Sequence, residues 1–370
     1  MNRSMPLSGD CFDRLRLIRS ANIGPVTFVQ LLRRFGSATA ALDAIPDLAA
    51  RGGGRAPRLA DPGAIEREMA AVAAAGARYI FLGDPAYPAY LAAIDSAPPA
   101  LTLRGDDSLL ARPIIAMVGA RNASAAACRF ARELAGALAA KGAVVVSGLA
   151  RGIDTAAHVG AMGAGDGGGT IGVIASGIDI AYPPENAGLQ ERIATEQLLI
   201  AEQPPGTEPL ARHFPFRNRI IAGLAAGTVV VEAAPRSGSL ITARLAGEFG
   251  REVMAVPGSP LDPRAQGCNA LIRDGATLIQ SAEDVLESIG PIDIRAADRL
   301  PIGPHVADAA AQASDAERRS VVELLSPTPV AVDELIRQSR QDPASVQTVL
   351  LELELAGRLE RHAGGKVSIG

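Results

Sequence analysis

The sequence predicts an α/β protein built on a Rossmann-like, doubly wound parallel sheet, with a helical domain before the sheet and a winged helix after it. Two observations indicate the sheet. Between Pro113 and Leu278, six short apolar runs alternate with helical stretches, and the runs lack the alternation of a half-exposed strand. Aromatic residues make up only 3% of the chain, so small side chains fill the core, which suits helices packed closely on a parallel sheet. The expected strands are Ile114–Val118, Val144–Val146, Ile171–Ala175, Leu198–Ala201, Val229–Val231 and Val253–Val256.

The segment before the sheet, residues 9–78, predicts a small helical domain. Its Asn-Ile-Gly-Pro turn resembles those of helix-hairpin-helix and sterile-alpha-motif elements, with Pro25 at the first position of a helix that Gly36 ends. The turn either presents backbone N–H groups and Arg33 or Arg34 to a phosphate, or it is a compact helical cap. The sequence leaves both interpretations open.

Residues 79–290 make up the predicted Rossmann-like domain, and two further segments follow it. Residues 291–312 are rich in Pro, Ala and Asp without periodicity, which indicates a flexible linker. Residues 313–370 predict three helices and a terminal hairpin around Gly364-Gly365, the arrangement of a winged helix.

The last helix of this predicted winged helix, Pro343 to Ala356, occupies the place of a recognition helix. It contains Glu352 and Glu354 but no Lys or Arg. Because insertion into a DNA groove needs positive charge, we expect this module to contact a protein, or other domains of the same chain, rather than duplex DNA.

The composition is that of a folded protein, with 48% apolar and 21% charged residues over 370 positions, enough for two or three domains. The net charge of −4 requires any nucleic-acid site to concentrate its positive charge locally. Lys141 and Lys366 are the only lysines, so this charge comes from arginine. Cys11, Cys128 and Cys268 are isolated, and no stretch is long and apolar enough to span a membrane, so we expect a cytoplasmic protein.

The loops that follow the expected strands carry the functional signal, because ligands of open parallel sheets bind beyond the carboxyl ends of the strands. Gly119 permits a close backbone approach, and Arg121 can reach an anion at the start of the next helix. The turn from Ser237 to Thr242 is rich in hydroxyl groups and glycine and can cradle a phosphate. Five such loops share backbone amides, hydroxyls and Arg, which suits a long polyanion better than one small substrate.

The sequence signals for catalytic and metal-binding residues are weaker than those for the loops. His158 and His213 have no recognisable nucleophile or carboxylate partner in the sequence, so we expect structural roles for both. Asp154, Asp179 and Glu232 follow strands, where carboxylates often cap the next helix or pair with Arg. We therefore expect no catalytic residue, no metal and no cofactor.

Taken together, these motifs closely resemble the DNA-processing protein A family, also called DprA or Smf, from Tyr87 to about Leu286. The resemblance implies a helical N-terminal module, a Rossmann-like domain and a winged helix. It also implies a protein without catalysis that binds single-stranded DNA, protects incoming DNA, forms a homodimer through the Rossmann-like domain and loads the RecA recombinase in natural transformation.

The resemblance also assigns residues. Arg121 matches the arginine of the family's Gly-Ser-Arg motif, although Ala120 replaces its serine. Family members often carry a lysine after Tyr-Pro, where this chain has Pro184, and Arg192 or Arg212 would have to substitute for it. The residues expected to face DNA are Gly119, Arg121, Asn122, Ser147, Gly148, Arg151, Gly177, Phe214, Arg217, Asn218, Arg219, Ser237, Gly238, Ser239 and Thr242.

Structural interpretations compete with some of these assignments. Arg217 and Arg219 can instead pair with a carboxylate such as Glu202 or Glu232. The phenylalanines at 214 and 216 can stack on bases, worth roughly 1–3 kcal/mol per base, or can pack in the core.

Two other functions remain open on the same sheet. One is a nucleotide-processing enzyme like the phosphoribohydrolases, and the other is a nucleotide-sensing regulator. Those enzymes follow a Gly-rich turn with a catalytic Glu, whereas the Ser-Gly-Ser-Leu-Ile-Thr-Ala turn here has no carboxylate. The Gly-x-Gly-x-x-Gly dinucleotide fingerprint is also missing after the first strand.

Overall fold

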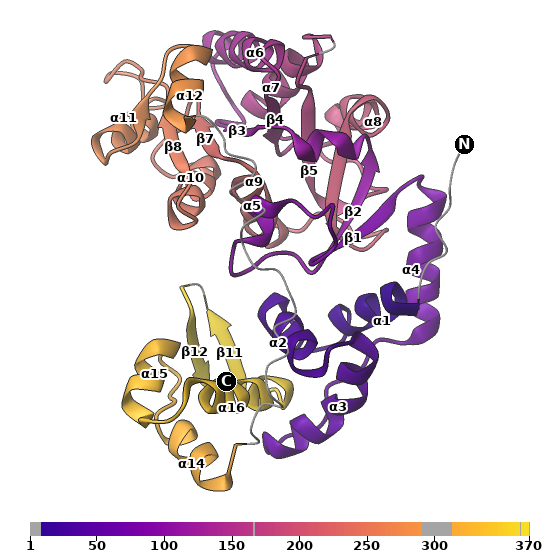
Figure 1. The fold of residues 1–370 in the computed structure, drawn as a ribbon. Helices are drawn as coiled ribbons and strands as arrows, with labels where there is room; N and C mark the ends of the chain where they lie inside the picture. The colour runs from indigo at the N-terminus through magenta and orange to yellow at the C-terminus, as the bar shows by residue number, and fades with distance from the viewer. Residues whose placement is uncertain (1–8, 166, 291–312, 363, 370) are drawn as a thin grey trace. The chain divides into compact units, whose positions relative to one another are not determined.

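The computed structural model describes residues 9–165, 167–290, 313–362 and 364–369, which form two compact units (Figure 1). The smaller unit contains residues 9–67 and 313–369, and the larger one contains residues 68–290. The linker predicted at residues 291–312 lies outside the described residues. No helix in the described parts of the chain combines the length and apolar character that crossing a bilayer requires.

The larger unit is built on a nine-stranded sheet with the order β1-β2-β6-β5-β4-β3-β7-β8-β9. Its six central strands lie where the apolar runs predict them, and each is parallel to its neighbours among the six. Strands β3, β4 and β5 are buried along their whole length, which explains why these runs do not alternate. The six are β3 (Ile114–Val118), β4 (Val144–Ser147), β5 (Thr170–Gly177), β6 (Leu198–Gln203), β7 (Gly227–Val230) and β8 (Glu252–Ala255).

Three further strands, which extend the sheet beyond these six, were not predicted. Strand β2 (Ala100–Gly105) runs antiparallel to β6, and β1 (Arg78–Phe81) runs antiparallel to β2. At the other edge, β9 (Thr277–Leu278) adds two residues parallel to β8. The sheet is therefore parallel at its centre and mixed at one edge.

Helices cover both faces of this sheet, which confirms the doubly wound architecture (Figure 1). Ile115 and Met117 of β3 pack in one core with the helices α6, α7 and α12. Ala116 and Val118 point the other way, into a core shared with α5, α9, α10 and α11. The helices are α5 (Ala89–Ala92), α6 (Ala125–Ala140), α7 (Ile153–Met162), α8 (Ala187–Glu196), α9 (His213–Leu224), α10 (Gly238–Glu248), α11 (Gln266–Arg273) and α12 (Ala282–Ile289).

The small residues predicted to permit close packing do so between α6 and α7. A Cβ placed on Gly160 would lie 2.1 Å from the carbonyl oxygen of Arg132, so no other residue fits at this position without a shift of the helices. Buried alanines of both helices, among them Ala135 and Ala157, line the same interface.

The smaller unit begins with the helices α1 (Gly9–Ile18), α2 (Pro25–Phe35), α3 (Ala38–Arg51) and the first part of α4 (Pro62–Ala74). As predicted, Pro25 is at the first position of α2, and Gly36 ends it with φ +74°. The predicted winged helix is also present. It consists of α14 (Asp315–Glu323), α15 (Val332–Ser339), α16 (Pro343–Leu355) and the strands β10 (Val330–Ala331), β11 (Leu359–His362) and β12 (Lys366–Ile369).

Helix α16, the expected recognition helix, is buried on two sides. Residues such as Val349 and Leu353 belong to the core of the winged helix, whereas Leu351 and Leu355 belong to the core formed by α2 and α3. A Cβ on Gly52 would lie only 2.1 Å from the carbonyl oxygen of Glu352, so the backbones meet closely at the end of α16. The expected contact between the winged helix and another domain of the chain is confirmed.

This contact also bears on the two interpretations of the N-terminal turn. Arg34 donates a hydrogen bond to the Thr348 hydroxyl at 3.2 Å, and it is therefore engaged with α16. Its neighbour Arg33 is exposed. The Arg34 contact supports the interpretation of the turn and α2 as a packing element.

Candidate functional site

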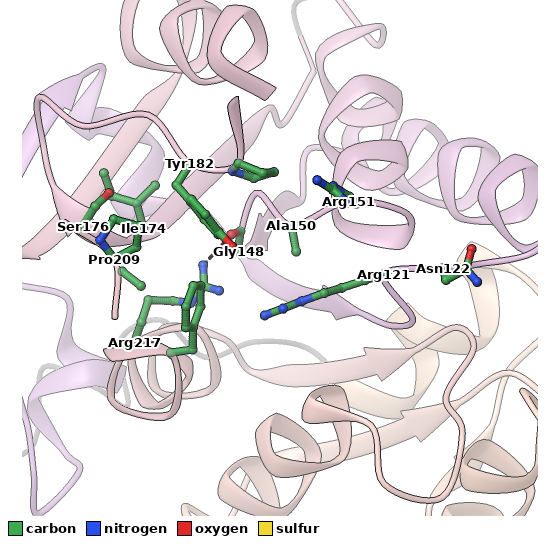
Figure 2. Close-up of a pocket in the computed structure, with 13 residues that line it drawn as sticks. Arg121, Asn122, Gly148, Ala150, Arg151, Ile174, Ser176, Tyr182, Pro209 and Arg217 are labelled. Carbon is green, nitrogen blue, oxygen red and sulfur yellow. Dashed lines mark hydrogen bonds between the residues drawn. The ribbon is translucent and has the colours of Figure 1, made fainter. Parts of the chain in front are cut away.

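A pocket of about 320 Å³ opens beyond the carboxyl ends of β3, β4 and β5 in the larger unit (Figure 2). Its residues come from the loops after β3 and β4, the end of β5, the segment before α8 and the start of α9. This is the edge at which an open parallel sheet binds its ligand. The lining consists of Arg121, Asn122, Gly148, Ala150, Arg151, Ile174, Ala175, Ser176, Tyr182, Pro183, Pro209, Phe214 and Arg217.

One side of the pocket combines arginines with aromatic rings. The Cζ atom of Arg121 lies 5.2 Å from the centre of the Phe214 ring, and that of Arg217 lies 6.0 Å from it. The rings of Phe214 and Tyr182 are 5.7 Å apart and inclined at 55°. Figure 2 shows the Arg121 side chain reaching toward Arg217 and Tyr182. Positive charge and ring faces are therefore available to the same ligand.

Arg217 forms the floor of the pocket. Its Nη1 donates to the carbonyl oxygens of Gly148, at 2.5 Å, and Val173, which ties the loop after β4 to β5. Burial lowers the pKa of Arg217 to about 10, with Asp154 opposing the shift and Arg121 adding to it. The guanidinium is still charged at neutral pH. Two arginines that repel each other at one site favour the binding of an anion.

The loop after β4 is held from the inside by buried polar groups. The carboxylate of Asp154 accepts hydrogen bonds from the backbone N–H groups of Gly148, at 3.1 Å, and Ala150, at 3.3 Å. Burial raises the pKa of Asp154, while Arg217 and these N–H groups oppose the shift. From the other side, the amide of Asn186 donates to the carbonyl oxygen of Leu149 at 2.8 Å. The loop is therefore fixed before any ligand arrives.

Leu149 in this loop has a positive φ of +56°, which costs free energy for a residue other than glycine. Its N–H donates to Nε2 of His158 at 3.3 Å, and Nδ1 of His158 lies 2.8 Å from the Thr170 hydroxyl. That hydroxyl in turn donates to Val145. The chain of bonds requires a neutral imidazole with its proton on Nδ1, and burial lowers the pKa of His158 to about 3. His158 is thus a structural residue that stabilises the loop.

The other candidate catalytic groups are also engaged elsewhere. Glu232 accepts hydrogen bonds from the backbone N–H of Ser124, at 3.0 Å, and from its hydroxyl, at 2.7 Å, and so caps the start of α6. Asp179 accepts from the N–H of Gly206, and Nδ1 of His213 accepts from that of Leu210. None of these carboxylates or imidazoles lines the pocket. No cluster of potential metal ligands occurs among the described residues.

Six of the residues expected to face a ligand line the pocket, namely Arg121, Asn122, Gly148, Arg151, Phe214 and Arg217. Phe214 is half-buried at the pocket, whereas Phe216 is 60% exposed, so the alternative of core packing is wrong for Phe216. Arg151 is exposed and forms an ion pair with Glu185.

Other expected residues shape the strand ends and do not line the pocket. Arg219 pairs with Glu202, as the structural interpretation predicted. The Ser147 hydroxyl donates to the carbonyl oxygen of Met117 at 2.7 Å. A Cβ on Gly119 would lie 2.5 Å from Ile153. The six remaining positions also lie outside the pocket lining. Asn218 accepts from Arg217, Gly177 lies against Pro204, and Ser237 caps α10, the helix that contains Gly238, Ser239 and Thr242.

The sequence analysis missed several lining residues, chiefly Tyr182 and Pro209. The Tyr-Pro-Pro-Glu-Asn segment, in which the family resemblance implies a lysine, contains the signal for Tyr182. Of the two proposed substitutes, Arg192 pairs with Glu196 on α8, and Arg212 precedes α9 without lining the pocket.

Comparison with known proteins agrees with this geometry. Residues 78–290, more than half of the chain, match the family model described as DNA recombination-mediator protein A. The chain belongs to this family. Its flanking segments match a DprA-like N-terminal HHH domain over residues 8–71 and a DprA winged helix domain over residues 305–365. The family resemblance and the three-module fold predicted from the sequence are both confirmed.

Individual members of the family are similar over long stretches. DNA processing protein DprA of Streptococcus pneumoniae is 47% identical over 203 residues, which covers 55% of this chain and 71% of that protein. Protein Smf of Escherichia coli is 38% identical over 293 residues, 76% of this chain and 75% of that protein. The family is one of recombination mediators, so the chain is a non-catalytic DNA-binding protein, as predicted.

Two solved structures of the family are similar in fold. That of DprA from Streptococcus pneumoniae has a TM-score of 0.64 and 33% identity, and the match covers 78% of this chain and all of that one. The structure describing the single-stranded DNA binding mode of DprA from Helicobacter pylori has a TM-score of 0.51 and 28% identity. That match covers 57% of this chain and 95% of that one.

The bonds of His158 lead to a testable pH dependence. Its pKa is about 3 in the folded chain and about 6.5 in the unfolded one, so the unfolded state binds a proton that the native state does not. Stability is therefore lost as the pH falls below about 6.5, by about 2 kcal/mol between pH 7 and pH 5. Urea unfolding at both pH values should show this loss in the free energy of unfolding of the wild type, and His158→Gln should not show it. Equal pH dependence in the two proteins would contradict the assignment.

Proposed function

We propose that the chain binds single-stranded DNA at the pocket formed by Arg121, Arg151, Arg217, Tyr182 and Phe214. The observation that carries the proposal is the placement of Arg121 and Arg217 over the Phe214 ring, in a pocket that Tyr182 and Arg151 also line. Guanidinium groups bind phosphates, and aromatic rings stack on any base without reading its identity. This combination suits an unpaired strand, whose bases are free to stack.

Each part of the pocket has a role in this proposal. Arg121 and Arg151 are exposed and contact phosphates, together with Asn122. Tyr182 and Phe214 receive a base. Arg217 is buried, so its main role is to hold Gly148 in place and to provide positive charge at the floor of the pocket. The other expected residues support the loops that carry these groups.

The enzyme alternative receives no support from the lining, which contains neither a carboxylate nor an imidazole. His158 and Glu232, its best candidates for catalysis, are bound to structural partners. A pocket of about 320 Å³ can accept one nucleotide, so it also fits a nucleotide-sensing regulator, and an experiment can distinguish the two functions. Binding of an oligonucleotide that a mononucleotide fully displaces would favour the regulator.

We propose further that the chain protects incoming DNA and loads the RecA recombinase in natural transformation, in the cytoplasm. The description of its family as recombination mediators supports this role. We also propose a homodimer through the Rossmann-like domain. Two exposed leucines of this domain, Leu261 at 92% and Leu278 at 46% on the edge strand β9, offer apolar surface to a second copy.

Arg121 provides the first test of the pocket. Changing Arg121 to Ala removes an exposed phosphate contact, so binding of a thymidine 20-mer should weaken by roughly tenfold at low salt. The slope of log affinity against log salt should fall by about 0.7, the value for one phosphate contact on a single strand. Fluorescence anisotropy measures both quantities. Arg244→Ala, an exposed arginine outside the lining, is the matched control, and an equal effect in both variants would contradict the proposal.

Glu185 provides a test with the opposite sign. It pairs with Arg151 at the mouth of the pocket and opposes the approach of phosphates. Changing Glu185 to Gln frees Arg151 and removes a negative charge, so affinity for the same oligonucleotide should rise by about two- to fivefold at low salt. In the background of Arg151→Ala the gain should be smaller, because only the removal of the negative charge then contributes. Weaker binding by Glu185→Gln alone would argue against a role for Arg151.

The partnerships can be tested together. Light scattering of the wild type should give the mass of a dimer, and Leu278→Arg should give that of a monomer if β9 borders the interface. Assembly of RecA on strands coated with a single-strand-binding protein should be faster in the presence of the wild-type chain. A monomeric wild type, or no effect on RecA assembly, would reject the corresponding proposal.

A further inference from the structure

The smaller unit contains a second basic groove, of about 390 Å³, between the helical domain and the winged helix. Three segments of the chain meet there: the end of α3 with Gly52 and Gly53, helix α14, and the second half of α16 together with Arg358 beyond it. The lining consists of Arg51, Gly52, Gly53, Arg318, Arg319, Val322, Glu323, Val349, Glu352, Leu353 and Arg358.

One of the arginines in this groove has a structural role. Arg318 donates from Nε and Nη2 to Glu352, at 2.7 and 3.3 Å, and from Nη1 to Asp315, at 2.8 Å. The side chain of Glu352 is completely buried, so this ion pair compensates a charge that would otherwise be costly. Arg318 and Glu352 therefore neutralise each other and leave the remaining arginines of the groove uncompensated.

Those remaining arginines are Arg51, Arg319 and Arg358. Nη1 of Arg358 donates a hydrogen bond to the carbonyl oxygen of Gly52 at 2.9 Å, which anchors the Arg358 guanidinium at the groove. Within the described parts of the chain, none of the three forms an ion pair. Glu323 is the one exposed carboxylate of the lining. Three guanidinium groups that share a groove repel one another, and an anion between them relieves that repulsion.

We propose that this groove is a second binding site, which takes phosphate groups of the backbone of single-stranded DNA. Arginine binds phosphate through two parallel N–H bonds, and several arginines can bind consecutive phosphates. The lining contains no aromatic ring, so it offers nothing on which a base can stack. The burial of α16 removes the helix that would enter a duplex groove. These features select the backbone of a flexible strand, without reading its sequence.

The inference takes the identity of its ligand, single-stranded DNA, from the proposed function. It rests on residues other than those of the pocket. It gives the winged helix a role in DNA binding that does not require its recognition helix to enter a duplex groove. The groove exists only when the helical domain and the winged helix are packed together, because each contributes arginines to it. Binding of DNA there would also stabilise their contact.

The test uses the full chain with Arg51→Ala and Arg319→Ala combined, which leaves the buried Arg318–Glu352 pair intact. The salt slope for a thymidine 30-mer should fall by about 1.4, the value for two phosphate contacts on a single strand. Hydrogen exchange should show slower exchange on addition of the 30-mer in peptides covering residues 51–54 and 318–323. This protection should be absent in the double variant. Arg337→Ala, an exposed arginine of the same unit outside the lining, should change neither result.

The outcomes separate this proposal from that of the pocket. If Arg121→Ala weakens binding while the double variant matches Arg337→Ala, the groove proposal fails and the pocket stands. If both weaken binding and only the double variant loses protection at residues 51–54, both proposals are supported. Protection of these peptides by a duplex or by a polyglutamate peptide, and not by the 30-mer, would assign the groove to another partner and overturn the proposal.

Discussion

The hydrogen bonds of the buried Arg217 guanidinium organise the candidate site. A single Nη1 atom joins the loop after β4 to strand β5, and a Cβ on Gly148 would lie 2.4 Å from this atom. A larger residue at position 148 would therefore displace the guanidinium of Arg217. The loop is bound on its other side by Asp154, Asn186 and His158, which are all buried. With this loop fixed, Arg151 at its end lies at a preformed pocket, and the adjacent Gly152 packs against the backbone of Arg121 in the loop after β3. A preformed site reduces the entropy that a ligand must lose on binding.

A second constraint shapes the smaller unit. Helix α16 packs with both the winged helix and the N-terminal helices, so it must be apolar on two sides. This explains why a helix in the position of a recognition helix carries no Lys or Arg, and why its Glu352 requires the Arg318 partner. The arginines near this helix lie instead on the segments that border it. The acidic total charge of the chain is thus compatible with local basic sites on both units.

Much of this could be predicted from the sequence, for identifiable reasons. The central strands were predicted because burial on both faces makes them continuously apolar. Strands β1 and β9 lie at the edges of the sheet, and β2, between β1 and β6, has Thr102 and Arg104 among its apolar residues, so all three carry a weaker pattern. The sequence predicts that both Arg121 and Arg217 lie near a ligand. It does not distinguish the exposed side chain of Arg121 from the buried one of Arg217, which depends on the tertiary fold. The motif Arg-Asn-Arg places consecutive side chains on different sides of α9, so Arg219 reaches Glu202 and not the pocket. Tyr182 was missed because its proximity to Phe214 depends on the tertiary fold.

Photocrosslinking tests the central claim most directly, because it reports which ring a base contacts. A thymidine oligonucleotide with 5-iododeoxyuridine at one position would be irradiated with the full chain, and the attached residue identified by mass spectrometry. The account predicts crosslinks to Tyr182 or Phe214 in the pocket. Phe216 lies on the same helix as Phe214, is 60% exposed and does not line the pocket, so it is an internal control. Crosslinks to Phe216 with none to Tyr182 or Phe214 would contradict the account.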